Sequence, residues 1–272
     1  MQDIVDYIIV GAGSAGCVLA NRLSTEPETS VAVFEAGGSD NKIFITMPAG
    51  FLRLMQTGQV DWGYETVPQS QLFGRRIHSP RGKVLGGSSS VNGMVYVRGD
   101  QSDFNHWSQL GNRDWSYADC LPYFKKSEAF EGVGGEARGK DGPLRVTRRG
   151  IKHPLALAFK EACEQSGISY NSDFNSGGDQ AGVGPTDATT ANNVRWSTSR
   201  AFLSPAMKRS NLKVFTRSLV TRILFEGERA VGIEYLRYGR LKKIRAKREV
   251  ILSGGAVNSP QLLQLSGVGD PE

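Results

Sequence analysis

A glycine-rich turn near the start of the chain has the spacing of a phosphate-binding loop. The segment Gly11-Ala-Gly-Ser-Ala-Gly16 follows the apolar run Asp6–Val10, and a helix is predicted from Ser14 to about Leu23. In this pattern the first glycine permits a tight turn, the second lets backbone approach a pyrophosphate, and the third lets the helix pack closely on the strand. The free N–H groups of the helix start then attract phosphate without a basic side chain.

An acid at the end of the next predicted strand supports a dinucleotide site. The strand Val31–Glu35 ends 19 residues after Gly16, where the ribose hydroxyls of a bound dinucleotide lie. The charge of Glu35 would repel a 2′-phosphate, which disfavours NADP. A glycine-rich turn alone is a weak signal, but strand, loop, helix, strand and acid together favour a binding loop over a purely structural turn. NAD and FAD both stay open because they share adenosine pyrophosphate.

A second glycine- and serine-rich segment runs from Pro80 to Tyr96. A flexible surface turn is the alternative interpretation. That alternative fits poorly because apolar side chains would tie the segment into a core, and its serines and Asn92 would then need buried partners. A cofactor with phosphates and a polar ring edge would supply such partners. The apolar residues are Val84, Leu85, Val91, Met94 and Val95.

The composition is that of an ordinary folded protein able to position such loops. The chain has 272 residues, of which 39% are hydrophobic and 22% charged, with a net charge of +6. The composition argues against wholesale disorder, and one large or two smaller domains are expected. Cys17, Cys120 and Cys163 form no Cys-x-x-Cys pair, so neither a disulfide framework nor a metal site is predicted. A reducing cytoplasm fits this cysteine usage best.

Two further segments have compositions that also occur in nucleic-acid-binding proteins and in signal peptides. Seven Lys or Arg residues lie between Arg237 and Arg248, a possible nucleic-acid stripe. Their alternation with apolar residues favours a solvated hairpin leading into a buried strand at Val250–Leu252, so no nucleic-acid partner is predicted.

The apolar stretch Tyr7–Ala20 begins behind acids and is interrupted by glycines. It predicts a folded motif rather than a signal peptide or transmembrane segment.

The sequence resembles the glucose-methanol-choline (GMC) family of flavin oxidoreductases over essentially its whole length. Gly82–Tyr96 is similar to the first signature of that family, and Gly255–Gly269 is similar to the second. Shorter matches are Asp61–Gln69, a helix from Trp115 to Phe124, and Ser197–Leu203.

The resemblance implies FAD, with its ADP part on the first loop and its flavin along the second. Some members attach FAD through a His in the second loop, but Val91 stands there, so non-covalent FAD is expected. The residues expected to bind the cofactor are Gly11, Gly13, Ser14, Ala15, Gly16, Glu35, Ala36, Trp62, Arg81, Val84, Gly86, Gly87, Ser88, Asn92, Gly93, Met94, Val95 and Val220.

No catalytic residue is predicted within the chain. The resemblance places the catalytic His of the family beyond Glu272, and His78, His106 and His153 are expected to have structural roles. The chain alone should therefore be a poor catalyst, and a companion chain supplying the C-terminal part is a conceivable partner.

The predicted architecture is α/β. A doubly wound, Rossmann-like FAD-binding domain is expected over residues 1–143 and 200–272, with an incomplete α+β substrate-binding domain at 144–199 and a linker at Gly132–Gly142. Within the substrate domain, a strand is predicted at Gly142–Thr147 and a helix at Leu155–Ser166.

The leading functional hypothesis is FAD-dependent oxidation of a primary alcohol to an aldehyde by hydride transfer to flavin N5. The resemblance is to the choline and alkanol dehydrogenase branch, with oxygen or a quinone as the electron acceptor. Two alternatives stay open at this point. One is a truncated FAD-binding fragment without activity alone, and the other is light-driven decarboxylation of a fatty acid.

Overall fold

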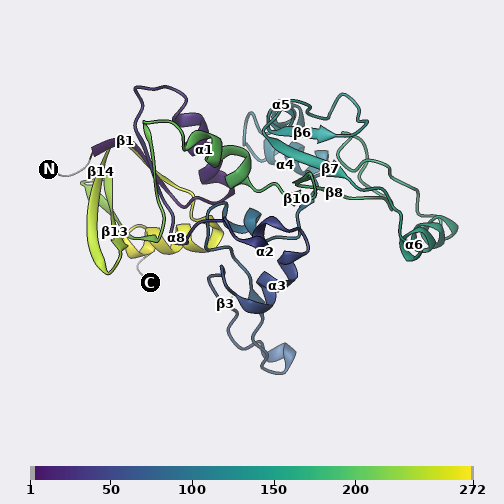
Figure 1. The fold of residues 1–272 in the computed structure, drawn as a ribbon, viewed down its shortest axis with the longest axis horizontal. Coiled ribbons are helices and arrows are strands. Elements are labelled where there is room, and N and C mark those ends of the chain that lie inside the picture. Colours follow the sequence, from purple (N-terminus) through teal and green to yellow (C-terminus); the bar gives the residue numbers. More distant parts are fainter. Residues whose placement is uncertain (1–3, 271–272) are drawn as a thin grey trace. The chain divides into compact units, whose positions relative to one another are not determined.

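The computed structural model describes residues 4–270. The chain divides into two compact units, one formed by the residues up to Gly93 together with those from Ser197 on, and the other by Met94–Trp196 (Figure 1). These breaks differ from the predicted domain boundaries at 143 and 199, and the assignment of domains by function stays a prediction. Within residues 4–270, no helix is both long and apolar enough to cross a membrane.

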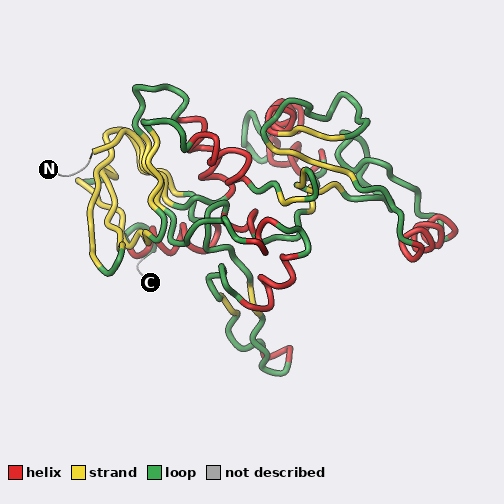
Figure 2. The backbone as a smooth tube through the Cα atoms, in the orientation of Figure 1, coloured by secondary structure: helices red, strands yellow, loops and turns green. Residues whose placement is uncertain are grey.

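The first unit is built on a six-stranded sheet (Figure 2). Its strand order is β11–β2–β1–β14–β13–β12, parallel from β11 to β14 and antiparallel beyond. The strands are β1 (Ile4–Val10), β2 (Val31–Phe34), β11 (Leu212–Phe215), β12 (Ser218–Glu226), β13 (Arg229–Arg237) and β14 (Arg240–Leu252). The single strand β14 pairs with β13 through its first half and with β1 through its second. The predicted basic hairpin is confirmed, but Val250–Leu252 continue the strand β14 itself and are half-buried rather than buried.

Helices lie on opposite sides of the parallel strands, α1 (Ser14–Leu23) on one and α8 (Gly255–Leu265) on the other (Figure 1). Alternation along β1 explains this layering, since successive side chains point to opposite faces. Ile8 and Val10 belong to a core with Leu262 of α8. A Cβ placed on Gly16 of α1 would come within 3.4 Å of the Ile9 side chain, on the other face. The predicted bounds of α1 are confirmed.

Short elements fix the second glycine-rich segment in the first unit. Val84 is fully buried in a small core with Ile45, Leu54 and Val60, which confirms that this part of the segment is tied into a core. The prediction is wrong for Asn92 and Val95, which are exposed at the end of the segment. The elements are α2 (Ile43–Thr46), α3 (Gly50–Thr57), β3 (Tyr64–Glu65), β4 (His78–Ser79), α7 (Ser204–Ala206), and helical turns at Ser70–Leu72, Gly87–Ser90 and Ser199–Leu203.

The second unit has a four-stranded sheet in the order β5–β8–β7–β6. Its elements are β5 (Val95–Tyr96), α4 (Gln101–Gln109), α5 (Tyr117–Ser127), β6 (Glu128–Glu131), β7 (Leu144–Arg148), α6 (Pro154–Gln165), β8 (Asp187–Ala188), β9 (Thr190–Ala191) and β10 (Val194–Arg195). The predicted strand over residues 142–147 is β7, and the predicted helix over residues 155–166 is α6. Helix α5 begins at a capping box in which Ser116 and Asp119 exchange hydrogen bonds.

The second unit encloses a buried ion network centred on Arg138. The Arg138 side chain bonds Glu128 at 2.6 Å and Asp187 at 2.8 Å, and its guanidinium carbon lies 3.7 Å from the centroid of the Phe130 ring. Only 3% of Arg138 is exposed. The prediction of a linker at Gly132–Gly142 is therefore wrong, because the middle of that segment is buried in the unit.

Replacing Arg138 by Met should destabilise the second unit by about 3–5 kcal/mol, because it leaves buried carboxylates without their partner. Arg145→Met is the matched control, since Arg145 pairs with Glu131 at 2.9 Å on the exposed surface. A surface pair is worth ~0–1 kcal/mol. Urea unfolding, followed by tryptophan fluorescence, measures both. Equal losses in the two variants would contradict the assigned role of the network.

The stability of the second unit should also fall in acid. Burial alone would raise the pKa of Asp187, but hydrogen bonds from Arg148, Arg138 and Asn175 outweigh it and lower the pKa below its ordinary value. The unfolded chain then takes up this proton at a higher pH than the folded chain does. The contribution of Asp187 is thus fully present above the unfolded pKa of about 3.9 and is lost as the pH falls through the lower folded pKa. Urea midpoints measured from pH 7 down to pH 3 should show this decline, and Asp187→Asn should flatten it.

Candidate cofactor site

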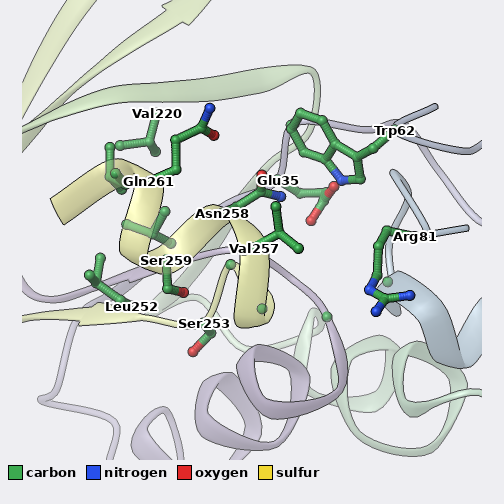
Figure 3. A pocket seen from close by; sticks show the side chains of 18 of the residues that line it. Glu35, Trp62, Arg81, Val220, Leu252, Ser253, Val257, Asn258, Ser259 and Gln261 are labelled. Atoms are coloured by element: carbon green, nitrogen blue, oxygen red, sulfur yellow. The ribbon is translucent and has the colours of Figure 1, made fainter. Parts of the chain in front are cut away.

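The first unit contains a cavity of about 910 Å³ at the carboxyl ends of its parallel strands. Val10, Phe34 and Leu252 end β1, β2 and β14, and all three line it. Ligands of open parallel sheets bind beyond these strand ends. Figure 3 shows the cavity between α8, with Val257, Asn258 and Gln261, and the side chains of Trp62 and Arg81.

Close backbone contacts between glycines form the floor of this cavity. A Cβ on Gly87 would lie 2.7 Å from the Gly13 Cα, and one on Gly11 would lie 2.6 Å from the carbonyl oxygen of Ser253. Both Gly11 and Gly87 have positive φ, at 95° and 54°. The N–H of Gly86 donates to the carbonyl of Ala12 at 2.8 Å. The two predicted loops and the turn after β14 therefore meet backbone to backbone, which a side chain at these positions would prevent.

Gly13 differs from Gly11 and Gly87 because protein packing does not require a glycine there. Its φ is −76°, and a Cβ there would approach protein atoms no closer than 3.9 Å. The missing side chain instead leaves room in front of α1. Neither α1 nor α8 has a side chain capping its first amides, and the residues at both helix starts line the cavity. Two uncapped helix starts beside one cavity suit the phosphates of a dinucleotide, so the residues present fit the ADP part of FAD.

Glu35 fastens the first loop to the end of β2. Its Oε2 accepts from the N–H of Ala12 at 2.9 Å and its Oε1 accepts from the N–H of Gly37 at 2.8 Å. Burial raises the pKa of Glu35 above its ordinary value, and these two hydrogen bonds oppose the rise. Each carboxylate oxygen has a second lone pair available to a hydroxyl donor.

Two aromatic side chains, Trp62 and Tyr64, form one wall of the cavity. The Trp62 ring stacks on Tyr64 with centroids 5.9 Å apart, and the Lys83 ammonium lies 4.4 Å from the Trp62 centroid. The Tyr64 hydroxyl donates to Oδ1 of Asn258, which ties the wall to α8.

Asp61 holds Arg81 beside this aromatic wall. Its Oδ1 accepts from the Arg81 N–H at 2.8 Å and its Oδ2 lies 2.7 Å from His78 Nε2. Burial raises the pKa of Asp61, but backbone hydrogen bonds from Arg81 and Gly63, together with His78, lower it overall. His78 therefore supports the wall, and His153 caps α6 by accepting from the N–H of Leu155 at 3.2 Å.

Cys17 is a packing residue beneath the first loop. Its Sγ donates to the carbonyl of Ala12 at 3.2 Å, and burial raises the pKa of the thiol to about 12. All three cysteines are free thiols.

The structure brings most of the expected cofactor-binding residues to this one cavity. Those that line it are Gly11, Gly13, Ser14, Ala15, Glu35, Ala36, Trp62, Arg81, Gly87, Ser88 and Val220. Three expected residues do not line the cavity but pack beneath the loops that do, namely Gly16, Val84 and Gly86. Two more, Asn92 and Gly93, also lie outside the lining. The last two, Met94 and Val95, belong to the second unit. That these residues bind FAD stays a prediction.

Sequence reasoning missed the wall formed by residues 252–262. The signal was present, because Ser253-Gly-Gly255 follows a strand and precedes a helix, as the first loop does.

Comparison with known proteins gives the class to which this fold and site belong. The profile of the GMC oxidoreductases matches residues 5–272. The oxygen-dependent choline dehydrogenase of Vibrio vulnificus is 52% identical over 99% of this chain and 48% of its own length. Pyridoxine 4-oxidase from Mesorbium loti has a TM-score of 0.91 at 36% identity, over 97% of this chain and 52% of that one. An FAD-dependent oxidoreductase from Chaetomium thermophilum has a TM-score of 0.90 at 31% identity, over 97% of this chain and 48% of that one.

The chain belongs to the GMC oxidoreductase family, and its first unit has the Rossmann-like FAD-binding fold of that family. The cofactor is FAD, which resolves the choice between NAD and FAD that the first loop leaves open. The chain spans about half the length of the curated relatives that it matches.

Gly87→Ala should disrupt this site, because Ala adopts the left-handed backbone conformation only at a cost of ~1–2 kcal/mol and its Cβ would also press on Gly13. We expect the affinity for FAD to fall at least about tenfold. Gly74→Ala is the matched control, since Gly74 also has a positive φ of 73° but lies outside the cavity lining, and a Cβ there meets nothing within 4 Å. Fluorescence titration with FAD compares the variants. If Gly87→Ala bound FAD as tightly as Gly74→Ala, the contact between the loops would not be needed for binding.

Proposed function

We propose that this chain is the FAD-binding part of an enzyme that oxidises a primary alcohol to an aldehyde. The observation that carries the proposal is the cavity lined by both glycine-rich loops and by two uncapped helix starts. When bound, FAD would supply the acceptor for the hydride that leaves the alcohol carbon.

The residues of the chain divide the task of holding this cofactor. The backbone amides at Gly13 and at the start of α8 would hold the pyrophosphate, and the remaining lone pairs of Glu35 would accept from the adenosine ribose. Val220 lines the cavity on β12, where its backbone would meet the adenine. Asn92, with the Met94–Val95 segment, would lie along the flavin.

The proposed substrate is an alcohol of the choline type, and the proposed electron acceptor is oxygen or a quinone. The support is the 52% identity to a protein named oxygen-dependent choline dehydrogenase. The comparisons give no support to light-driven decarboxylation of fatty acids, so that alternative is set aside.

Activity would require the polypeptide that corresponds to the other half of these relatives, either within a longer chain or as a companion chain. We place the catalytic base there, because the three histidines present have no position in the cavity lining. The absence of a general base costs ~10²–10⁴ in rate. The chain by itself should therefore bind FAD but turn over slowly.

The FAD should be released by acid, because Val91 offers no side chain for a covalent link to the flavin. Precipitating the yellow protein with trichloroacetic acid should leave the colour in the supernatant. A yellow pellet would contradict non-covalent binding.

Oxidation of the alcohol is tested by following the visible absorbance of the flavin in the absence of oxygen, so that reduced flavin is not reoxidised. The chain paired with the second half of the Vibrio relative should lose its visible flavin absorbance when choline is added, and this chain alone should bleach ~10²–10⁴-fold more slowly. Ethyl trimethylammonium, which lacks the hydroxyl, is the control ligand. Retention of full colour with choline and with a panel of other primary alcohols would overturn the proposed function.

A further inference from the structure

The hairpin formed by β13 and β14 exposes apolar side chains at its tip. Tyr238 and Gly239 form the two-residue turn of this hairpin, and both have positive φ, at 50° and 74°. Tyr238 is 71% exposed, and the cross-strand neighbours Leu236 and Leu241 are 38% and 62% exposed. Figure 1 shows β13 and β14 at the outer margin of the first unit.

Folding alone does not account for a tyrosine in this turn. A turn with two left-handed residues favours Asn, Asp or Gly, because a larger side chain is strained in that conformation. Most of Tyr238 is in solvent, so packing recovers little of this cost. Strained positions of this kind cluster at binding sites and switch regions.

Basic side chains surround the apolar tip. The segment from Arg237 to Arg248 contains seven Lys or Arg residues and neither Asp nor Glu. The register places Arg237 directly opposite Arg240, and like charges in that position destabilise a sheet. Within residues 4–270, neither Arg240 nor Lys242 takes part in an ion pair, and both are exposed.

Two cations nearer the base of the hairpin do have carboxylate partners. Arg245 pairs with Glu226 at 2.6 Å, and Lys243 lies 3.8 Å from Glu234. Unpaired positive charge therefore accompanies the apolar side chains at the tip.

An anionic lipid surface matches both properties of the tip. Tyr and Leu side chains enter the boundary between headgroups and acyl chains, and Lys or Arg beside them attract anionic headgroups. A nucleic acid would pair with the cations but would leave the two leucines in water. An apolar protein surface would cover the leucines but would leave the cations without partners.

We propose that the β13–β14 hairpin docks this protein on the surface of a membrane that contains anionic lipids. The side chains of Tyr238 and Leu241 enter the headgroup boundary, and those of Arg240 and Lys242 contact the lipid phosphates. The inference is independent of the proposed function, because none of these residues lines the cavity.

Sedimentation with lipid vesicles tests this proposal. The chain, in excess FAD, is mixed with vesicles of phosphatidylcholine and phosphatidylserine at a ratio of about three to one, and separately with phosphatidylcholine alone. It should bind the anionic vesicles and leave the neutral ones unbound. Raising the salt concentration should weaken the binding, because salt screens the attraction between the cations and the headgroups.

Two hairpin variants separate the charges from the apolar contact. Arg240→Gln/Lys242→Gln and Tyr238→Asn/Leu241→Thr should each reduce the vesicle partition coefficient at least about tenfold. Asn suits the turn and Thr suits a strand, so the second variant preserves the hairpin.

Lys125→Gln/Lys126→Gln is the charge-matched control. Both lysines are exposed on α5, outside the hairpin, and their loss should leave vesicle binding unchanged. The urea midpoint of each variant should match that of the unaltered chain, because all the altered side chains are exposed.

Three results with vesicles would overturn the proposal: no binding of the unaltered chain to anionic vesicles, equal binding of both hairpin variants, or an equal loss with the control. Duplex DNA that bound more tightly than the vesicles through Arg240 and Lys242 would assign the hairpin to nucleic acid instead. Self-association of the unaltered chain that Tyr238→Asn/Leu241→Thr abolished would show that a second copy covers the tip. Either of these would also overturn the proposal.

Discussion

The site depends on the contact between two glycine-rich loops that are far apart in the sequence. A Cβ at Gly87 would lie 2.7 Å from Gly13, and the N–H of Gly86 donates to Ala12. Glu35 adds a second fastening, because one carboxylate holds the amides of Ala12 and Gly37. The cavity is thus shaped by the protein itself, and little ordering is left for a ligand to impose. Such preorganisation improves affinity because less conformational entropy is lost on binding.

The second unit is stabilised in a different way. Its strands are short, and its interior holds a network of arginines and carboxylates around Arg138 and Glu128. Burying these charges is tolerable only because each has a partner in place. The ring of Phe130 packs on both Arg138 and Arg148, so apolar and ionic contacts converge there. A unit held in this way presents α6 on its surface without needing that helix for its own core.

The sequence predicted well those helices and strands whose pattern lies within a short stretch of the chain. The apolar run, the glycine spacing and the acid of the first loop predicted β1, α1 and β2 with errors of at most two residues. The role of Arg138 could not be predicted, because its carboxylate partners lie 10, 35 and 49 residues away in the sequence. The second compact unit begins at Met94, well before the predicted boundary at residue 143. Local sequence could not indicate this, because β5 belongs to the unit through its pairing with β8, more than ninety residues later in the chain. The family signature recognised at Gly255–Gly269 includes the start of α8, but the position of residues 252–262 on the cavity wall depends on the sheet order.

The most direct test of the central claim is a competition experiment on the unaltered chain. FAD is titrated into the protein and its fluorescence is followed, first alone, then with excess ADP and then with excess FMN. The account predicts that FAD binds, that ADP displaces it by occupying the first loop and the α8 start, and that FMN competes far less. Failure to bind FAD, or displacement by FMN as readily as by ADP, would contradict it.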